Sequence, residues 1–399
     1  MKELFLPQGK SIINRLLVIY FLKGENRDNI KINASLDTLL MSNLIKQIEE
    51  GKDKTFFCYN AATITRFIIS ILALKKGFWI VDAQEQMQKN RPIYPLVDAL
   101  RLLGAKINYL DKENNLPISI EGGLIRGGIK IEIDNTITSQ VVSSLLLISP
   151  YLKGGLEIGL KDNKTSFSYI NLTISLMRQF GILVEKIGDN IIKIPESEYK
   201  IKEIEIENDW SSACFAYEQL ALQRKGEIFI RNLFPNSLQA DSKAKDYFSL
   251  LGIRTQFIDK NIILSYDNTS SNSKDELSFN LIDSPDMFPS LAVSGYFSGK
   301  KVIFYGINNL QYKESNRLSA VEEGLISLGA KVIINKESFT IMPIEKSNIP
   351  NKNIIIKTYD DHRIAMAFYL VKLIKENLEI DNRDCISKSF PLFFENFNM

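Results

Sequence analysis

The stretch LRLLGAKINYL, residues 100–110, joins a helix-like apolar run to a β-rich run through a single glycine, Gly104. Three further stretches have the same order: LMRQFGILVEKI (176–187), FSLLGIRTQFI (248–258) and LISLGAKVIIN (325–335). From Gly104 onward, the glycines of these stretches are spaced by 77, 71 and 77 residues. Glycine readily takes the left-handed conformation that ends a helix, so each stretch predicts a helix, a tight turn and a returning strand. A repeat of about 70 residues predicts duplicated α/β modules rather than a solenoid.

Two less distinct copies of this pattern, around Leu44–Gly51 and Leu370–Ile380, would bring the number of modules to six. A chain of 399 residues is long enough for two domains with full-sized cores, so we expect three modules in each domain. The charged, strand-like segment KIKEIEIEN gives way to DWSSACFAY near Glu207–Asp209, which predicts a crossing between domains there. We expect Asp209 to cap the helix that follows.

The composition is that of a soluble globular protein, with 45% hydrophobic and 24% charged residues. Because 49 basic residues face 47 acidic ones, the net charge of +2 does not indicate nucleic acid or a membrane surface as a partner. Three widely spaced cysteines and a single histidine, His362, disfavour disulfides and a zinc site. The first residues lack a signal-peptide pattern and the apolar runs are shorter than a membrane span, so we expect a cytoplasmic protein.

The stretch LPQGKSIINR, Leu6–Arg15, predicts the start of a helix after the turn residues Pro7 and Gly9. The first-turn N–H groups, Lys10, the Ser11 hydroxyl and Arg15 would together attract a phosphate or carboxylate. Taken alone, the stretch is better explained as a capped helix with solvated basic residues. The rest of the chain has to decide between the two interpretations.

The motifs of common enzyme classes do not occur: there is no P-loop, no GxGxxG after a strand and no GxSxG. The chain instead contains short polar clusters beside turn residues. Each cluster has an ordinary explanation: Arg66 and Arg91 could lie on the surface, and Lys313, Glu314 and Arg317 could form ion pairs on a solvated helix. Together, however, the clusters supply seven cations beside two carboxylates, which suits multiply anionic substrates and proton transfer. The cations are Lys10, Arg15, Arg91, Lys313, Arg317, Arg363 and Lys388, and the carboxylates are Asp286 and Glu314.

The order of these clusters resembles the 5-enolpyruvylshikimate-3-phosphate synthase family. The resemblance runs from Leu6 to about Phe394, nearly the whole chain. It rests on LPQGKSIINR, NAATITR, RPIYPLVDALRLLGAKI, TSQVVSSLLL, DWSSACFAY, DSPDMFPSLAV, YKESNRL, DDHRIAMAF and SKSFP in this order. The family transfers the enolpyruvyl group of phosphoenolpyruvate (PEP) to the 5-hydroxyl of shikimate 3-phosphate in the shikimate pathway of aromatic amino acid biosynthesis.

The resemblance implies an α/β (α+β) fold: a two-domain, inside-out α/β barrel of six βαβαββ-type modules. One domain would comprise residues 9–208 and the other residues 1–8 with 209–399, and the active site would lie in the cleft between them. Pro7–Gly9 would then be the second chain crossing. Only 45 residues separate Arg15 from Asn60, fewer than is typical of the family, so we expect a trimmed first module.

The resemblance also implies the residues of the site. Those expected to bind shikimate 3-phosphate are Ser11, Arg15, Thr138, Ser139, Gln140, Ser166, Tyr169, Asp286, Asn309 and Lys313. Those expected to bind PEP are Lys10, Ala62, Arg91, Gln140, Arg317, Arg363 and Lys388. Asp286 and Glu314 are the expected proton-transfer groups, with Lys10 assisting. No metal or organic cofactor is implied, and we expect a monomer with neither nucleic acid nor a membrane as a partner.

The chemistry explains why these residue types are needed. The methylene carbon of PEP must gain a proton while the shikimate 5-hydroxyl attacks the adjacent carbon, which gives a tetrahedral intermediate. Elimination then removes the proton and expels phosphate. One group must therefore give and take a proton at carbon, and another must take the hydroxyl proton. The sequence leaves open which of Asp286 and Glu314 does which, and it favours a structural hydrogen bond from His362 that orients Arg363.

Two sequence differences bear on the PEP side. Ala62 stands where the family has glycine, so its methyl group projects toward the expected PEP site. We therefore expect weakened PEP binding and tolerance of glyphosate, a PEP-competitive inhibitor. The turn PQGK also places Gly9 next to Lys10, whereas the family turn reads PGSK.

Two alternatives stay open. UDP-N-acetylglucosamine enolpyruvyl transferase shares the fold and the PEP chemistry, but that family uses a loop cysteine, and Cys58 and Cys214 do not lie in such a context. A degenerate relative that binds anions without turnover is the other alternative, suggested by Ala62 and the trimmed first module. The motifs YKESNRL and DDHR favour the shikimate enzyme over the first alternative, and the retention of Lys10, Asp286, Glu314 and the clamp arginines argues against the second.

Overall fold

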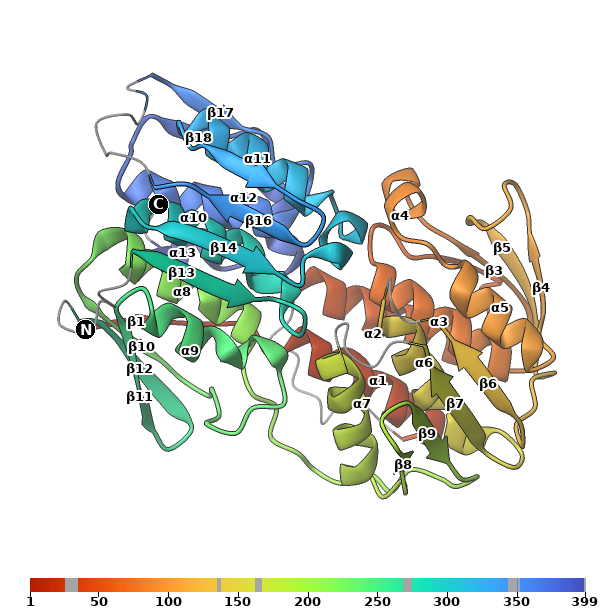
Figure 1. Ribbon diagram of the computed structural model, residues 1–399. Helices are drawn as coiled ribbons and strands as arrows, with labels where there is room; N and C mark the ends of the chain where they lie inside the picture. Colours follow the sequence, from red (N-terminus) through yellow and green to blue (C-terminus); the bar gives the residue numbers. More distant parts are fainter. Residues whose placement is uncertain are drawn as a thin grey trace. The chain divides into compact units, whose positions relative to one another are not determined.

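The computed structural model describes residues 1–25, 35–134, 138–161, 167–267, 275–343, 350 and 352–397. The chain forms two compact units, each with its own hydrophobic core (Figure 1). Unit 1 comprises Met1–Gly9 with Glu207–Met399, and unit 2 comprises Lys10–Ile206.

Unit 2 begins with two helices and continues with alternating strands and helices. Its described elements are α1 (Lys10–Lys23), α2 (Leu36–Glu50), β2 (Thr55–Phe57), α3 (Ala62–Leu74), β3 (Gly77–Asp82), α4 (Glu85–Asn90), α5 (Tyr94–Leu102), β4 (Lys106–Tyr109), β5 (Ile118–Gly122), β6 (Lys130–Ile133), α6 (Gln140–Ile148), η1 (Ser149–Tyr151), β7 (Leu156–Leu160), α7 (Phe167–Gln179), β8 (Glu185–Ile187) and β9 (Ile191–Ile194). The strands form two sheets, in the orders β2-β3-β5-β4 and β6-β7-β9-β8.

Unit 1 contains the first strand of the chain and everything after residue 206. Its described elements are β1 (Lys2–Leu4), α8 (Trp210–Gln223), β10 (Glu227–Ile230), η2 (Ala240–Lys243), α9 (Ala244–Ser249), β11 (Ile253–Ile258), β12 (Asn261–Tyr266), β13 (Glu276–Asn280), η3 (Pro285–Met287), α10 (Phe288–Ser298), β14 (Lys301–Tyr305), η4 (Asn308–Tyr312), α11 (Arg317–Ser327), β15 (Val332–Ile334), β16 (Ser338–Ile341), β17 (Ile354–Ile356), α12 (His362–Leu370), η6 (Val371–Leu373), β18 (Leu378–Ile380), η7 (Asp384–Lys388) and α13 (Phe393–Phe397). The sheets have the orders β1-β10-β12-β11, β13-β14-β16-β15 and β17-β18.

The four-stranded sheets of the described residues share one pairing pattern. In each, the first two strands are parallel and the other two pairs are antiparallel, as in β13-β14-β16-β15. A parallel pair needs a crossover, and a helix supplies it: α10 connects β13 to β14, and α3 connects β2 to β3. The prediction of repeated α/β modules is therefore confirmed. The described residues form four complete modules and a two-stranded sheet, β17-β18, and the count of six stays a prediction because residues 26–34, 344–349 and 351 lie outside them.

The glycines that ended the four sequence repeats take the expected conformation. Gly104, Gly181, Gly252 and Gly329 have φ values of 100°, 83°, 85° and 91°. Each is followed within four residues by the strand β4, β8, β11 or β15. A side chain with a Cβ is strained at such φ values, which is why glycine marks the helix-to-strand turn in each repeat.

The helices of each unit pack against one another, and the sheets lie around them (Figure 1). In unit 1, α8 packs on α10 and α12, and nearly every residue of these three helices is buried. Helices that are buried on all sides are apolar on all sides, which explains why these segments lack a clear polar face. The few polar side chains inside them therefore need an explanation.

Two backbone hydrogen bonds join the first residues of the chain to the start of α8. The Gly9 N–H donates to Glu207 O at 2.9 Å, and the Asp209 N–H donates to Pro7 O at 2.8 Å. The prediction that Asp209 caps a helix is confirmed, because its carboxylate accepts from the Ser212 N–H at 2.9 Å.

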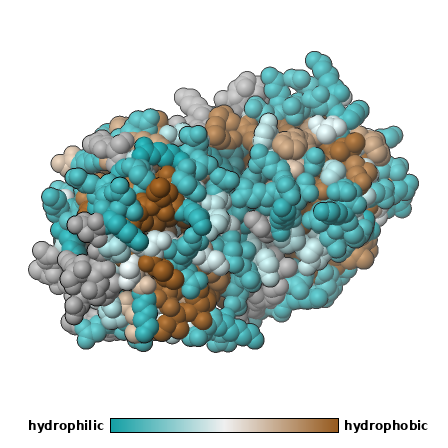
Figure 2. All heavy atoms as spheres, turned by 90° about the horizontal axis from the view of Figure 1, so that it is seen from above, coloured by the Kyte–Doolittle hydropathy of each residue, from teal (hydrophilic) through white to brown (hydrophobic). Residues whose placement is uncertain are grey.

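Hydrophilic side chains cover much of the face seen in Figure 2, with small hydrophobic patches between them. Within the described ranges, no helix has the length and apolar character needed to cross a membrane.

Candidate active site

Asp286 is the centre of a charged cluster in unit 1. Its carboxylate lies 2.7 Å from Arg317 Nη1, 3.2 Å from Lys313 Nζ and 3.2 Å from Arg363 Nη2. Burial alone would raise the pKa of Asp286, but the three cations hold it well below its usual range. Asp286 is therefore ionised at neutral pH, and the cluster keeps a net positive charge that suits anionic ligands.

Short irregular segments and helix starts bring these side chains together. Asp286 lies in η3, directly before α10, and Lys313 follows η4. Arg317 is the first residue of α11, and Arg363 is the second residue of α12. Arg317 and Arg363 are thus held at helix N-termini, whose free N–H groups also favour anions.

Asp361 fixes the position of Arg317, although sequence reasoning did not select it. It accepts from Arg317 Nε at 2.8 Å and from Arg317 Nη2 at 3.2 Å, and it caps α12 by accepting from the Arg363 N–H at 3.0 Å. Both Asp361 and Arg317 are buried. A fork of two hydrogen bonds between buried groups holds the guanidinium in one orientation.

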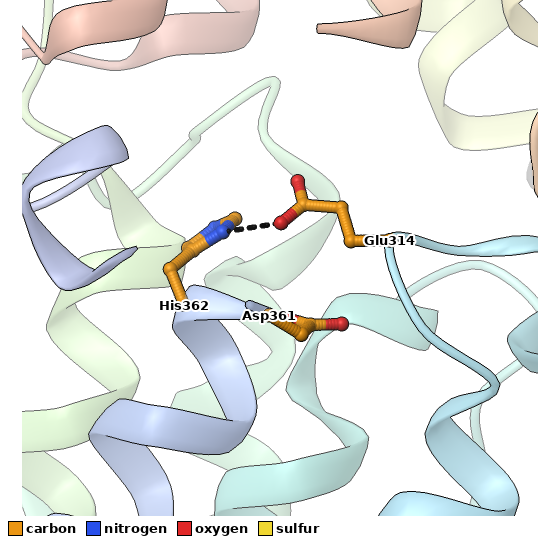
Figure 3. A group of neighbouring side chains, drawn as sticks. All are labelled: Glu314, Asp361 and His362. Carbon is orange, nitrogen blue, oxygen red and sulfur yellow. Dashed lines mark hydrogen bonds and ion pairs between the residues drawn. The ribbon is translucent and has the colours of Figure 1, made fainter. Parts of the chain in front are cut away.

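Glu314 is placed beside the Asp286 cluster by the segment that precedes α11. Its carboxylate lies 2.8 Å from His362 Nδ1 and 2.9 Å from Lys388 Nζ. Figure 3 shows the ring of His362 and the carboxylate of Glu314 pointing toward each other. We expected His362 to orient Arg363, but the described hydrogen bond of its ring goes to Glu314.

The ligand atoms of Glu314, Asp361 and His362 lie within 4.8 Å of one another, a spacing that could suit a metal ion (Figure 3). However, Lys388 contacts Glu314 and Arg317 contacts Asp361. Because both carboxylates already contact cations, the cluster is better explained as an ion-pair network than as a metal site.

Asp241, in η2, is a further carboxylate of this region that sequence reasoning missed. It accepts a hydrogen bond from the Ser211 hydroxyl in the first turn of α8. Burial raises its pKa to about 6, and the negative charge of Asp286 adds to this shift. No motif marked it, because the segment LQAD contains neither a helix-start pattern nor a second charged residue.

Asn309, the remaining expected site residue of unit 1, lies in η4 and is buried. It belongs to the same connection between β14 and α11 that carries Lys313 and Glu314.

In unit 2, Arg15 is the centre of a second polar cluster. It lies in α1 and is fully buried, and its Nε donates to the Thr173 hydroxyl at 2.7 Å. Its Nη2 lies 3.3 Å from Gln140 Oε1, 3.2 Å from the Ser143 hydroxyl and 3.3 Å from the Tyr169 carbonyl oxygen. The structure thus brings Arg15 together with two further expected residues, Gln140 and Tyr169, from α6 and α7.

All described partners of Arg15 are neutral. Burial therefore lowers its pKa to about 10, and Arg15 still carries its charge at neutral pH. Thr138 and Ser139 precede Gln140 at the start of α6, where the Gln140 N–H donates to the Thr138 hydroxyl at 3.2 Å. Since a buried cation without a counter-ion is costly, this cluster favours the binding of an anionic group.

The first residues of α1 occupy the helix start that the sequence predicted. Helix α1 begins at Lys10, and the Ser11 carbonyl oxygen accepts from Arg15 Nη1 at 2.7 Å. Lys10 Nζ lies 2.8 Å from the carboxylate of Asp37, in the first turn of α2. Sequence reasoning missed Asp37 because it lies outside the recognised motifs.

Ala62 and Arg91 lie at the ends of two helices of unit 2. Ala62 is the first residue of α3, and Arg91 directly follows α4. One turn after Ala62, Arg66 is buried, so the interpretation of Arg66 as a surface residue is wrong. Burial lowers the pKa of Arg66 to about 9, and the charge of Arg91 contributes to the shift. The Arg66 guanidinium donates to the Ala62 carbonyl oxygen at 3.2 Å and to the Pro92 carbonyl oxygen at 2.8 Å.

The expected residues therefore form two groups, one in each unit. Unit 1 gathers Asp286, Lys313, Glu314, Arg317, Arg363 and Lys388 into adjoining ion-pair networks. Unit 2 gathers Arg15, Gln140 and Tyr169, while Lys10, Ala62 and Arg91 have other described neighbours. Ser166 lies outside the described residues.

Comparison with known proteins gives one consistent result. A family model described as EPSP synthase (3-phosphoshikimate 1-carboxyvinyltransferase) matches residues 22–397. The 3-phosphoshikimate 1-carboxyvinyltransferase of Bacteroides fragilis is 34% identical over 98% of this chain and 93% of its own length. The enzyme of the same name from Pseudomonas syringae pv. tomato is 32% identical over 98% of this chain and 92% of its own. A solved EPSP synthase structure from Acinetobacter baumannii has a similar fold, with a TM-score of 0.73 at 19% identity over 99% of this chain and 94% of that chain.

Proposed function

Because the chain belongs to the EPSP synthase (3-phosphoshikimate 1-carboxyvinyltransferase) family, we propose that it transfers the enolpyruvyl group of PEP to the 5-hydroxyl of shikimate 3-phosphate. The reaction releases inorganic phosphate. The observation that carries the proposal furthest is the Asp286 cluster, in which one ionised carboxylate is surrounded by Lys313, Arg317 and Arg363. Such a site offers a hydrogen-bond acceptor for hydroxyls and several cations for phosphate and carboxylate groups.

We assign the substrate contacts to the two groups of residues described above. Shikimate 3-phosphate is bound by Ser11, Arg15, Thr138, Ser139, Gln140, Ser166, Tyr169, Asp286, Asn309 and Lys313. PEP is bound by Lys10, Ala62, Arg91, Gln140, Arg317, Arg363 and Lys388. The buried charge of Arg15 and the orientation of Arg317 by Asp361 support these assignments, because both arginines are ready to meet an anion without rearrangement.

We further assign the two proton transfers. Three cations stabilise the charged form of Asp286, so it is a poor proton donor and suits the role of acceptor beside the 5-hydroxyl. Glu314 contacts both His362 and Lys388, so these neighbours can return a proton to its carboxylate or take one from its carboxyl group. Glu314 then protonates the PEP methylene carbon as the hydroxyl oxygen attacks the adjacent carbon. As phosphate leaves, Glu314 takes a proton back from that methyl group, and the hydroxyl proton held by Asp286 passes to the released phosphate.

The proposal is tested by measuring phosphate release from the purified protein with PEP and each of two acceptors. With shikimate 3-phosphate we expect sustained release of phosphate, and with UDP-N-acetylglucosamine we expect none. Release only with the UDP-sugar would assign the chain to the other enolpyruvyl transferase reaction. No release with either acceptor, together with measurable binding of shikimate 3-phosphate, would support a binding protein without turnover.

The expectations of a monomer and of a cytoplasmic location are also proposals. The composition, which has no strong charge bias, supports the location. The monomer is expected from the resemblance to the family. Light scattering of the purified protein tests the first, and fractionation of the source cells tests the second.

A further inference from the structure

Helices α8 and α10 pack side by side in the core of unit 1 and run in the same direction. Near their starts, the Ser290 hydroxyl donates to the Cys214 carbonyl oxygen at 3.4 Å. Near their ends, Arg224 Nη2 donates to the Phe297 carbonyl oxygen at 2.8 Å. The two helices are therefore parallel, with their starts beside each other and their ends beside each other.

This register places Glu218 of α8 opposite polar side chains of α10. Glu218 follows Cys214 by four residues, and Ser294 follows Ser290 by four, so each pair lies on one helix face. Glu218 consequently lies at the level between Ser290 and Ser294. The Ser290 hydroxyl is near enough to lower the pKa of Glu218, against the larger effect of burial, which raises it well above its usual range.

The side chains of Glu218 and Ser294 are buried without hydrogen bonds of ordinary geometry. Glu218 is 0% exposed and Ser294 is 2% exposed. Within the described part of the chain, neither carboxyl oxygen of Glu218 nor the Ser294 hydroxyl has a hydrogen bond of ordinary geometry, and the interaction of Glu218 with Ser290 competes with the bond from Ser290 to the Cys214 carbonyl oxygen. Buried polar atoms in folded proteins are almost always paired, so three such atoms at one level of two adjacent helices indicate an absent ligand.

We propose that Glu218, Ser290 and Ser294 bind a monovalent cation, K⁺ or Na⁺, between helices α8 and α10. The ligand atoms are carboxyl and hydroxyl oxygens, which suit hard cations rather than transition metals. One carboxylate is neutralised by one positive charge, whereas a divalent ion would leave an uncompensated charge in the apolar core.

The position of this site connects it to the Asp286 cluster. Helix α10 follows directly after Asp286, and the first turn of α8 carries Ser211, which holds Asp241. A cation bound between α8 and α10 would therefore hold the starts of these two helices in place, next to the Asp286 cluster. A cavity of about 310 Å³ lies at the C-terminal ends of the helices, and its lining includes Ser294 together with Arg224 and Lys300.

The site is tested by thermal unfolding of the full-length protein in 100 mM KCl, NaCl or tetramethylammonium chloride at one pH. Because a ligand that binds only the folded state raises the Tm, we expect K⁺ or Na⁺ to raise it by about 3 °C or more over the bulky cation. The shift should saturate with concentration. Glu218→Gln, which keeps the size of the side chain, should abolish the shift, and Ser294→Ala should raise the concentration needed for half of it.

The matched control is Glu227→Gln, an exposed carboxylate of the same unit, which should keep the full shift. Equal Tm values in all three salts would overturn the proposal and leave a protonated acid or an internal water beside Glu218. If Glu218→Gln does not fold, crystals of the unaltered protein soaked in rubidium chloride decide the question. An anomalous peak between α8 and α10 supports the site, and the lack of a peak there contradicts it.

Discussion

At the scale of single residues, Asp286 and Glu314 are the side chains whose loss should matter most. Both lie against cations, Asp286 against Lys313 and Glu314 against Lys388. We expect Asp286→Ala and Glu314→Ala each to lower kcat by about 100-fold or more, since general acid–base groups contribute about 10²–10⁴ in rate. Steady-state assays measure kcat, and calorimetry should show that shikimate 3-phosphate still binds.

The control for these variants is Asp283→Ala. Asp283 lies three residues before Asp286, and its described ion pair is with Lys243 instead of the cluster cations. The kcat of Asp283→Ala should stay within about threefold of the kcat of the unaltered protein. Unchanged turnover in either Asp286→Ala or Glu314→Ala would remove that residue from the proposed proton transfers.

The methyl group of Ala62 leads to a second prediction at this scale. Ala62 is buried at the first position of α3, where a methyl that crowds PEP would cost about 1.4 kcal/mol, or tenfold in affinity. Ala62→Gly should therefore lower the KM for PEP about tenfold and make glyphosate inhibit at lower concentration. Inhibition titrations of both proteins measure this, with Ala61→Gly as the neighbouring control. Equal sensitivity of the unaltered protein and Ala62→Gly would contradict the role given to the methyl group.

At the scale of secondary-structure elements, Asp361 joins α11 to α12. It caps α12 and accepts two hydrogen bonds from Arg317, the first residue of α11. Burial is the largest single influence and raises the pKa of Asp361, but the charge and hydrogen bonds of Arg317, together with His362, outweigh it, so the pKa in the folded protein is below the usual value. The carboxylate therefore stabilises the fold at pH values above its unfolded pKa, and this contribution is lost as the pH falls below that value.

Asp361→Asn should accordingly lower the free energy of unfolding by about 3 kcal/mol at pH 7, as expected when one partner of a buried ion pair is removed. The difference between the two proteins should begin to shrink as the pH is lowered from 5 to 3, because the Asp361 carboxyl of the unfolded chain takes up a proton there, and the rest is lost as the pH falls through the folded-state pKa. Urea unfolding at each pH measures the difference. A difference that stays constant down to pH 3 would show that the charge of Asp361 is not what stabilises these helices.

At the scale of the whole molecule, the two hydrophobic cores are separate in sequence. The core of unit 2 uses residues between Ile12 and Tyr199, while that of unit 1 uses Leu4, Leu6 and residues from Trp210 onward. A fragment of residues 10–206 thus contains a complete core and should fold alone, with native-like circular dichroism and cooperative unfolding. It should show no turnover, because Asp286 and Glu314 are missing. A disordered fragment would show that unit 2 depends on unit 1 for its stability.

The sequence predicted the repeated architecture because the glycine that marks each repeat acts on the backbone locally. Gly104 and its three counterparts end helices by a conformation that a single residue determines, and the structure confirms each one. The trimmed first module and the count of six modules stay predictions, because residues 26–34, 344–349 and 351, beside the two outer modules, lie outside the described residues.

The site was predictable only where its residues belong to recognisable motifs. The Asp286 cluster was anticipated, but Asp361 was not selected as the partner of Arg317, because that contact joins residues 44 positions apart. The burial of Arg66 was missed for a related reason: its partners are backbone oxygens, and only the fold shows that no solvent reaches them. Contacts between distant segments depend on packing, which local patterns do not specify.

The most direct test of the proposed chemistry is to run the reaction in D₂O and examine the product by NMR. Protonation and deprotonation at the methylene carbon of PEP pass through a methyl group, so solvent deuterium should enter that carbon. We predict shikimate 3-phosphate that carries an enolpyruvyl group with deuterium in its methylene, and loss of this product in Glu314→Ala. An enolpyruvyl product without deuterium would contradict the addition–elimination mechanism, and the absence of any enolpyruvyl product would contradict the proposed activity itself.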